Sequence, residues 1–367
     1  MKNARILSGY DLELVKGFVR IVDGEIREIE RGHTSKDGID LKGSILMPPF
    51  VNAHTHVGDS VAKDIYAGRT QPEVVGGGGY KFRALSQSSR EEKIGAIRNS
   101  LLEMRNSGSI AHLDFREGWM EGLSQLKDAE IPDLKSFSLT RPSDGTDIEE
   151  LLSESDGIGV PSLESYSMEK LETISELVSS HDKLLSFHVS ETESAHETSL
   201  DETGQTEIER ALAFDPNFLI HGVWAETEDL RALSEEDVSL VMCPRSNSLL
   251  STGVPPIREA LDEGVELWLG TDNVSVCPPI MFHELSFAWT MLRLQDERAG
   301  ETEAKELLKA ATVNPLKELD LKAGPLMEGK TANFLIISPD RNLRKTESLY
   351  LGLVNRCRAG DIESIVS

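Results

Sequence analysis

Between residues 45 and 294 the chain alternates short apolar runs with amphipathic segments, and this alternation restricts the fold more than any other feature. Short apolar runs bounded by turn residues are typical of buried parallel strands, and segments with a 3.6-residue period are typical of helices. Strands and helices in strict alternation predict an α/β fold, a (β/α)8 barrel of the TIM type. We expect strands at 45–51, 109–115, 136–139, 158–162, 184–189, 218–223, 239–243 and 266–271, and helices at 90–106, 120–129, 168–181, 256–263 and 282–294.

A doubly wound open sheet is the alternative to the barrel. No Gly-x-Gly-x-x-Gly turn follows the first expected strand. The run Gly76–Gly79 has no strand before it and no Lys-Ser or Lys-Thr pair after it, so it does not have the pattern of a phosphate-binding loop. We expect a flexible loop there, or a lid.

Both ends of the chain have the pattern of short strands. Residues 5–7, 18–22 and 25–29 are β-like, with a hairpin turn at Asp23-Gly24, and 333–337 and 348–351 have the same character. Neither end carries enough apolar residues for a core of its own. We therefore predict a small β-sandwich domain built from residues 1–46 and 324–367, beside a barrel formed by residues 47–323.

Composition excludes several classes of partner. The net charge is −25, which disfavours nucleic acid and anionic membrane surfaces, because both require a basic face. We find no signal-peptide pattern and no apolar run near 18 residues. The three cysteines, Cys243, Cys277 and Cys357, form no metal-binding pair. These features predict a cytoplasmic protein that binds neither nucleic acid nor a membrane.

Polar residues follow the apolar runs at the expected strand ends. His54 and His56 stand two apart, so on a strand they face the same side, and His188, His221 and Asp272 each end another run. A lone His-x-His pair is weak evidence for a metal site. Five such residues at one rim of a barrel, where catalytic groups gather, are much stronger evidence. His112, inside an apolar run, is expected to be a packed core histidine.

The motifs around these residues resemble the metal-dependent amidohydrolase superfamily. They are Asn52-Ala53-His54-Thr55-His56, His188 with Glu191, Leu219-Ile220-His221-Gly222, Cys243-Pro244-Arg245-Ser246-Asn247 and Gly270-Thr271-Asp272-Asn273. The branch most similar to them contains the cytosine, guanine and S-adenosylhomocysteine deaminases and the triazine hydrolases. Asn273 departs from the glycine or alanine more common at its position, so the resemblance does not identify the substrate.

The resemblance implies one divalent metal ion, zinc with iron as the alternative, held by His54, His56, His188 and Asp272. A metal-activated hydroxide would attack a polarised carbon, with Asp272 taking the proton of the water. Glu191 would carry protons to a ring nitrogen and to the leaving ammonia, and His221 would bond the water or the developing oxyanion. Binuclear members use a lysine from the fourth strand, and 157–164 contains none. This absence predicts a mononuclear site.

Further polar residues near the expected rim are candidates for substrate binding. Several cationic groups on one rim could hold a carboxylate or phosphate of the substrate, with internal salt bridges as the alternative. The candidates are Asp59, Lys63, Arg116, Arg141, Arg245 and Asn247.

These features lead to a hypothesis of a deaminase that releases ammonia from an amino-substituted nitrogen heterocycle, such as a nucleobase, nucleoside or pterin-like compound. The alternatives are hydrolysis of a cyclic amide, imidazolone or triazine-type ring, and a non-catalytic relative with a binding role. A homodimer is compatible with this kind of barrel, although no sequence feature decides the oligomeric state.

Overall fold

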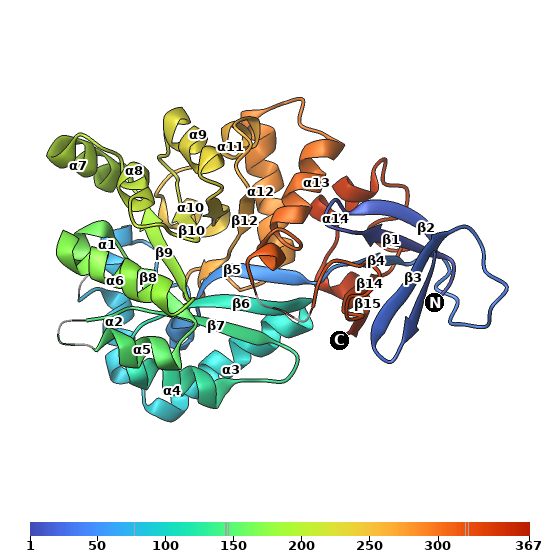
Figure 1. Cartoon of the computed structure of the whole chain (residues 1–367), viewed down its shortest axis with the longest axis horizontal. Coiled ribbons are helices and arrows are strands. Elements are labelled where there is room, and N and C mark those ends of the chain that lie inside the picture. Colours follow the sequence, from blue (N-terminus) through green and yellow to red (C-terminus); the bar gives the residue numbers. More distant parts are fainter. Residues whose placement is uncertain (77, 144, 146, 320, 322) are drawn as a thin grey trace.

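The computed structural model describes residues 1–76, 78–143, 145, 147–319, 321 and 323–367. Two sheets lie along the longest axis of the molecule, a larger one surrounded by helices and a smaller one that holds both chain ends (Figure 1). Among the described helices, none has the length and apolar character needed to cross a lipid bilayer.

The larger sheet is a closed barrel of parallel strands. Its order is β12-β11-β10-β9-β8-β7-β6-β5-β13, and β12 and β13 are two parts of one chain segment, separated only by Gly270-Thr271. Asp272 of β13 pairs with Thr55 of β5, so the last strand returns to the first. This closure confirms the predicted (β/α)8 barrel and excludes the open sheet. The strands are β5 (Phe50–His56), β6 (Ser109–Arg116), β7 (Lys135–Thr140), β8 (Gly157–Val160), β9 (Leu184–Val189), β10 (Phe218–His221), β11 (Ser239–Met242), β12 (Leu267–Leu269) and β13 (Asp272–Asn273).

Close contact between the first and last strands requires a glycine at the join. A Cβ atom at Gly270 would lie 2.7 Å from both Cβ and the backbone nitrogen of His54. Asn52 and Thr271 then fasten the two strands, since the Asn52 amide donates to Thr271 Oγ1 at 2.7 Å and its oxygen accepts from the Thr271 backbone N–H at 2.9 Å. Glycine therefore allows the strand that carries Asp272 to approach the strand that carries the histidine pair.

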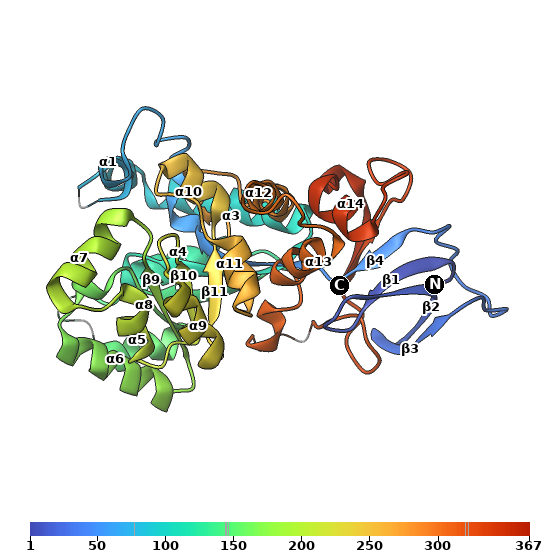
Figure 2. The same cartoon turned by 90° about the horizontal axis from the view of Figure 1, so that it is seen from above.

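Helices surround the barrel, and the last of them lies beside the smaller sheet (Figures 1 and 2). They are α1 (Gln71–Val75), α2 (Tyr80–Gln87), α3 (Arg90–Asn106), α4 (Trp119–Ala129), α5 (Ile148–Glu154), α6 (Met168–Ser180), α7 (Glu193–Thr203), α8 (Glu207–Leu212), α9 (Thr227–Glu235), α10 (Pro244–Leu250), α11 (Ile257–Asp262), α12 (Met281–Gln295), α13 (Glu301–Ala310) and α14 (Leu349–Asn355). The 3₁₀ turns among the described residues are η1 (Val57–Val61), η2 (Leu163–Ser165), η3 (Pro315–Lys317) and η4 (Ala359–Asp361).

Helix α3 illustrates how local sequence sets these elements. Ser89 caps it by accepting a hydrogen bond from the Glu92 backbone N–H, and the Glu92 side chain bonds back to the Ser89 N–H. Ile97 and Leu101, four residues apart, are buried on its inner face. The predicted helix at 90–106 is confirmed with its cap at Ser89.

The smaller sheet joins both chain ends, as predicted. Its order is β15-β14-β4-β1-β2-β3, and its inner face buries Ile6, Val19, Leu46 and Phe334 in one apolar cluster. Its strands are β1 (Ala4–Ser8), β2 (Glu13–Val22), β3 (Glu25–Arg31), β4 (Ile45–Met47), β14 (Phe334–Ile337) and β15 (Ile362–Val366). The division into domains at 46/47 and 323/324 stays a prediction.

The expected single strand at 45–51 is wrong, because it divides at Pro48-Pro49. Residues Ile45–Met47 form β4 of the smaller sheet, and Phe50–His56 form β5 of the barrel. Proline has no backbone N–H and a fixed φ, so a ladder of hydrogen bonds cannot continue through this pair. The histidine pair consequently lies within the barrel strand rather than after it.

The expected strand at 348–351 is also wrong. Ser348 caps helix α14 by accepting from the Leu351 N–H at 3.5 Å, and the helix packs against α12 and α13. Tyr350, Leu353 and Val354 are buried, which is the i, i+3, i+4 spacing of a helix face. One edge strand of the smaller sheet is β15, which the sequence pattern did not predict.

Candidate metal centre and active site

Four side chains predicted to bind metal converge at the carboxyl ends of the barrel strands. His54 and His56 come from β5, His188 from β9 and Asp272 from β13. The Nε2 atoms of His54 and His56 lie 3.3 and 3.5 Å from Oδ1 of Asp272. Candidate ligand atoms of His54, His56 and His188 lie within 4.8 Å of one another, and so do those of His54, His221 and Asp272.

Backbone carbonyl groups orient two of these imidazoles. Nδ1 of His56 lies 3.1 Å from the Phe115 carbonyl oxygen, and Nδ1 of His188 lies 3.1 Å from that of Val160. A ring that donates through Nδ1 leaves its Nε2 lone pair free for a cation. Within the described chain, Nδ1 of the fully buried His54 has no hydrogen-bond partner, and Nε2 has only its contact with Asp272. This ring therefore lies where a metal ion would supply the missing interaction.

The protonation states of these groups fit a divalent cation. Burial lowers the pKa of His54, and it holds the pKa values of His56 and His188 well below the ordinary range, so all three rings are neutral. Burial raises the pKa of Asp272, but the close contact with the His54 imidazole outweighs this and holds that pKa well below its usual value. Ser246 Oγ also donates to Oδ2 of Asp272 at 2.5 Å. Three neutral imidazoles and one carboxylate form a donor set suited to zinc.

His221 and Glu191 stand beside the metal-binding group. His221 ends β10 with φ +75°, a left-handed conformation that is uncommon outside glycine and frequent at functional sites. Its Nε2 lies 3.8 Å from Oε2 of Glu191, and its Nδ1 lies 3.3 Å from Nδ2 of Asn247. Because the Asn247 amide donates to Nδ1 of His221, this nitrogen is an acceptor and the ring proton lies on Nε2, which faces Glu191. Burial raises the pKa of Glu191 above its ordinary value, and the charge of His221 opposes that shift.

A buried network of charges lies next to the metal-binding group. Lys81 of α2 contacts Oδ2 of Asp59 at 2.9 Å and Oε1 of Glu117 at 2.6 Å, and Arg141 contacts the same oxygen of Glu117 at 3.3 Å. Asn273, directly after Asp272, donates to Oδ2 of Asp59 at 2.7 Å. Lys81 was not predicted, and nothing in the local sequence separates it from an exposed lysine.

These groups surround one cavity of about 250 Å³. Gln71 and Val75 of α1 cover it, together with Gly76, the first residue of the predicted flexible loop or lid; Gly77 lies outside the described residues. The lining residues are His56, Gln71, Pro72, Val75, Gly76, Lys81, Glu117, Arg141, Pro161, His188, Glu191, His221, Leu250, Asp272 and Asn273. The cavity therefore gives a small molecule access to both the metal-binding group and Glu191.

Of the six residues predicted to bind substrate, Arg141 lines this cavity. Asp59 is buried behind Lys81, and Asn247 is buried behind His221. Lys63 is exposed outside the lining.

The remaining two arginines make contacts within the protein. Arg116 is buried and donates to the Gly122 carbonyl at 2.9 Å and to Gln125 at 3.1 Å. The backbone N–H of Arg245 donates to Glu284 at 2.9 Å, and its guanidinium lies 3.5 Å from Nδ1 of His283.

The predicted core histidine is confirmed. His112 is fully buried, with Nδ1 2.9 Å from Thr55 Oγ1 and Nε2 2.7 Å from Ser136 Oγ. Burial lowers the pKa of His112 to about 3, so the ring is neutral and serves packing.

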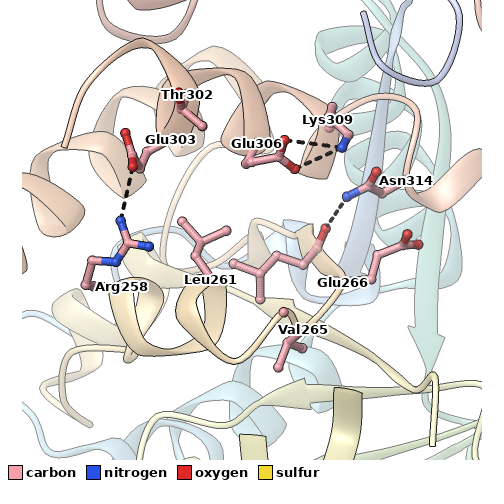
Figure 3. Close-up of a pocket in the computed structure, with 11 residues that line it drawn as sticks. Arg258, Leu261, Val265, Glu266, Thr302, Glu303, Glu306, Lys309 and Asn314 are labelled. Atoms are coloured by element: carbon pink, nitrogen blue, oxygen red, sulfur yellow. Dashed lines mark hydrogen bonds and ion pairs between the residues drawn. The ribbon is translucent and has the colours of Figure 1, made fainter. Parts of the chain in front are cut away.

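A second cavity of about 320 Å³ lies at the opposite end of β12, between α11 and α13 (Figure 3). Its charged groups pair with one another, Arg258 with Glu303 at 3.3 Å and Lys309 with Glu306 at 2.9 Å. Leu267, in its wall, lies at the start of β12, whereas Asp272 follows the other end of that strand. The predicted metal ligands and Glu191 therefore lie at the first cavity and not at this one.

Comparisons with known proteins agree with this geometry. Residues 45–355 match the model of the Amidohydrolase family. The chain is 31% identical to an uncharacterized protein of Methanocaldococcus jannaschii, over 98% of this chain and 95% of that protein. It is 26% identical to a 5-methylthioadenosine/S-adenosylhomocysteine deaminase of Pyrococcus furiosus, over 100% of this chain and 92% of that one.

Solved structures show the same fold at low sequence identity. A guanine deaminase from C. acetobutylicum with bound guanine has a TM-score of 0.80 and 15% identity, covering 100% of this chain and 97% of that one. An atrazine chlorohydrolase from Arthrobacter aurescens complexed with zinc has a TM-score of 0.80 and 17% identity, covering 98% and 94%.

Proposed function

Because the chain belongs to the Amidohydrolase family, we propose that it is a zinc-dependent aminohydrolase that releases ammonia from an amino-substituted nitrogen heterocycle. The observation that carries this proposal is the position of Glu191, in the wall of the cavity that His56, His188 and Asp272 also line. The name of the Pyrococcus furiosus relative supports a nucleoside-like substrate, and a nucleobase or pterin-like compound is compatible with the same chemistry.

His54, His56, His188 and Asp272 would hold the metal. When bound, such a cation lowers the pKa of water toward neutrality and stabilises negative charge on oxygen. The two groups of atoms that could hold a cation share His54, which favours one ion rather than two. β8, the fourth strand of the barrel, consists of Gly157–Val160 and contains no lysine to bridge a pair of ions.

The remaining groups of this chain have distinct roles in the proposed reaction. Water adds to the ring carbon that carries the amino group, the C–N bond breaks, and the nitrogen leaves as ammonia. Asp272, ionised and bonded by Ser246, can accept a proton from the attacking water. Glu191, whose pKa burial raises above its ordinary value, can deliver a proton to a ring nitrogen, take up a proton that originates from the attacking water, and pass it to the leaving amine. The Nε2–H of His221 can donate to the oxygen that gains charge.

The location and partners that we propose follow from the surface and the cysteines. The net charge of −25 disfavours nucleic acid and anionic membranes. All three cysteines are buried and unbridged, which suits a cytoplasmic protein. A homodimer is the proposed alternative to a monomer.

Two other functions would give different products. Hydrolysis of a cyclic amide or imidazolone opens the ring, and a triazine-type displacement releases a group other than ammonia. The absence of a bridging lysine from β8 disfavours the first. A non-catalytic relative would not need the convergence of four potential ligands.

The test is a screen of the zinc-loaded protein against purines, pyrimidines, their nucleosides and pterins. We expect ammonia release with an intact ring in the product. Ring opening without ammonia, or no turnover of any compound by protein with one zinc per chain, would contradict the proposal.

A further inference from the structure

The backbone immediately before Glu191 is strained. Ser190 follows β9 with φ +46°, in the left-handed region that residues with a Cβ seldom occupy. Its carbonyl oxygen accepts from the Trp224 backbone N–H at 3.0 Å, and the side chain is fully buried. A turn of this kind persists only when its surroundings hold it in place. The direction in which the Glu191 side chain leaves the strand depends on this turn.

A carboxylate from helix α8 holds the N–H side of this turn. Oε2 of Glu207, at the start of α8, accepts a hydrogen bond from the Ser190 backbone N–H at 2.7 Å. Glu207 is 2% exposed and does not line the cavity, so it cannot touch a substrate there. Burying a carboxylate costs free energy unless it is hydrogen-bonded. The Glu207 carboxylate is bonded to the backbone N–H of the residue directly before Glu191, the proposed proton carrier.

We propose that Glu207 is a positioning residue, which fixes the left-handed turn at Ser190 and thereby directs Glu191 toward His221. This inference rests on the proposed function of Glu191. Glu207 acts through the backbone and is distinct from the groups that contact the reacting atoms.

The same contact makes the position of Glu191 sensitive to pH. Burial raises the pKa of Glu207 to about 7, the Ser190 N–H and the charge of Arg210 lower it, and the charges of Glu164 and Glu191 raise it. A hydrogen bond to an ionised acceptor is stronger than one to a neutral acceptor, by roughly five-fold as an equilibrium constant. The turn is therefore held more firmly above pH 7 than below it.

Three variants test this role in the zinc-loaded protein. Glu207→Ala removes the acceptor, and we expect kcat to fall about ten-fold or more with KM and zinc content unchanged. Glu207→Gln keeps a neutral acceptor, and we expect it to retain most of the activity while its kcat–pH profile loses an ionisation near pH 7. Glu209→Gln is the control, because the Glu209 carboxylate bonds the Thr206 N–H at 3.0 Å at the other side of the same helix start. It should leave the profile unchanged.

A rescue experiment separates positioning from general stability. Glycine adopts positive φ at no cost, so adding Ser190→Gly to Glu207→Ala should restore a large part of the lost kcat. If Glu207→Ala lowered kcat only by destabilising the fold, Ser190→Gly would not restore kcat, because glycine increases the conformational entropy of the unfolded chain.

Crystal structures of the wild type and of Glu207→Ala give a readout that does not depend on turnover. We expect Ser190 to leave the left-handed region and Glu191 to move away from His221 in the variant. If the wild type deaminates no substrate but this movement is seen, the proposed function fails and the positioning role stands. An active enzyme in which Glu207→Ala keeps the Ser190 turn, kcat and the pH profile of the wild type would overturn the inference.

Discussion

Replacement of Glu191 by glutamine tests the proposed proton transfer most directly. Glutamine has almost the same shape and can still form hydrogen bonds, but it cannot carry a proton. Glu191 belongs to neither group of candidate ligand atoms that lie within 4.8 Å of one another. Its Oε2 lies 3.8 Å from Nε2 of His221. We therefore expect the variant to bind zinc at the wild-type level.

The size of the effect follows from how often the carboxylate is used. General acid–base catalysis is typically worth about 10²–10⁴ in rate, and Glu191 would act twice in each turnover. We expect kcat to fall by about 10³–10⁴, or about 4–5.5 kcal/mol of transition-state stabilisation. KM should change little, because the proton transfers occur after the substrate has bound.

The assay is ammonia release at saturating substrate, with the zinc content of each sample measured in parallel. Glu193→Gln is the matched control, since Glu193 is exposed at the start of α7 and lies outside the cavity. It should leave kcat unchanged. Normal turnover by Glu191→Gln, or loss of its zinc, would refute the role that we assign to this residue.

Three further substitutions have defined outcomes. His188→Ala removes one of four ligands, so zinc content and activity should fall together; wild-type zinc with normal turnover would contradict the ligand set. Lys81→Met leaves the carboxylates of Asp59 and Glu117 without their shared cation. We expect the free energy of unfolding, measured by urea titration at pH 7, to fall by about 3–5 kcal/mol. An unchanged value would show that the network does not stabilise the fold. Burial raises the pKa of Glu284 to about 8, so the folded protein keeps a proton that the unfolded chain loses above about pH 4.5. This group therefore makes stability fall between about pH 4.5 and 8, and Glu284→Gln should flatten that slope by a few kcal/mol in melting experiments across this range; a parallel slope would exclude it.

The barrel and its metal-binding group could be predicted because both depend on local patterns. Strand and helix periods are visible in short windows, and parallel strands in a barrel end on the same rim. The residues His54, His56, His188, His221 and Asp272 could therefore be placed on one rim without knowing any distance between them, and the resemblance to the amidohydrolases singled out four of these as the metal ligands. Their convergence in the structure follows from topology alone.

The charge network could not be predicted in this way. Lys81 is buried because Asp59 and Glu117, from η1 and the loop after β6, meet it in space, and no short window of sequence contains that contact. Arg116, by contrast, was predicted to be functional and instead makes contacts within the protein. Its place after a strand suggested substrate binding, but the Gly122 carbonyl and Gln125 occupy its guanidinium.

Two errors in the predicted strands have local causes. The Pro48-Pro49 pair divides one apolar run between two sheets. Leu349–Asn355 is rich in β-like residues, but a serine cap and a helical spacing of buried side chains make it a helix. In both cases a local feature, the proline pair or the serine cap, decided the structure against the composition of the segment.

The smaller sheet has a consequence for how the chain reaches its native state. Ser8 Oγ donates to the carbonyl oxygen of Leu326, 318 positions later, and β4 pairs with β14 across a similar span. During synthesis, Ile6, Val19 and Leu46 therefore remain exposed until Phe334 has left the ribosome. Contacts of such long sequence separation form slowly, and exposed apolar strands in the interval favour aggregation. Chaperone availability and a slow rate of translation near the end of the message should therefore affect the yield of folded protein more than changes at the barrel rim do.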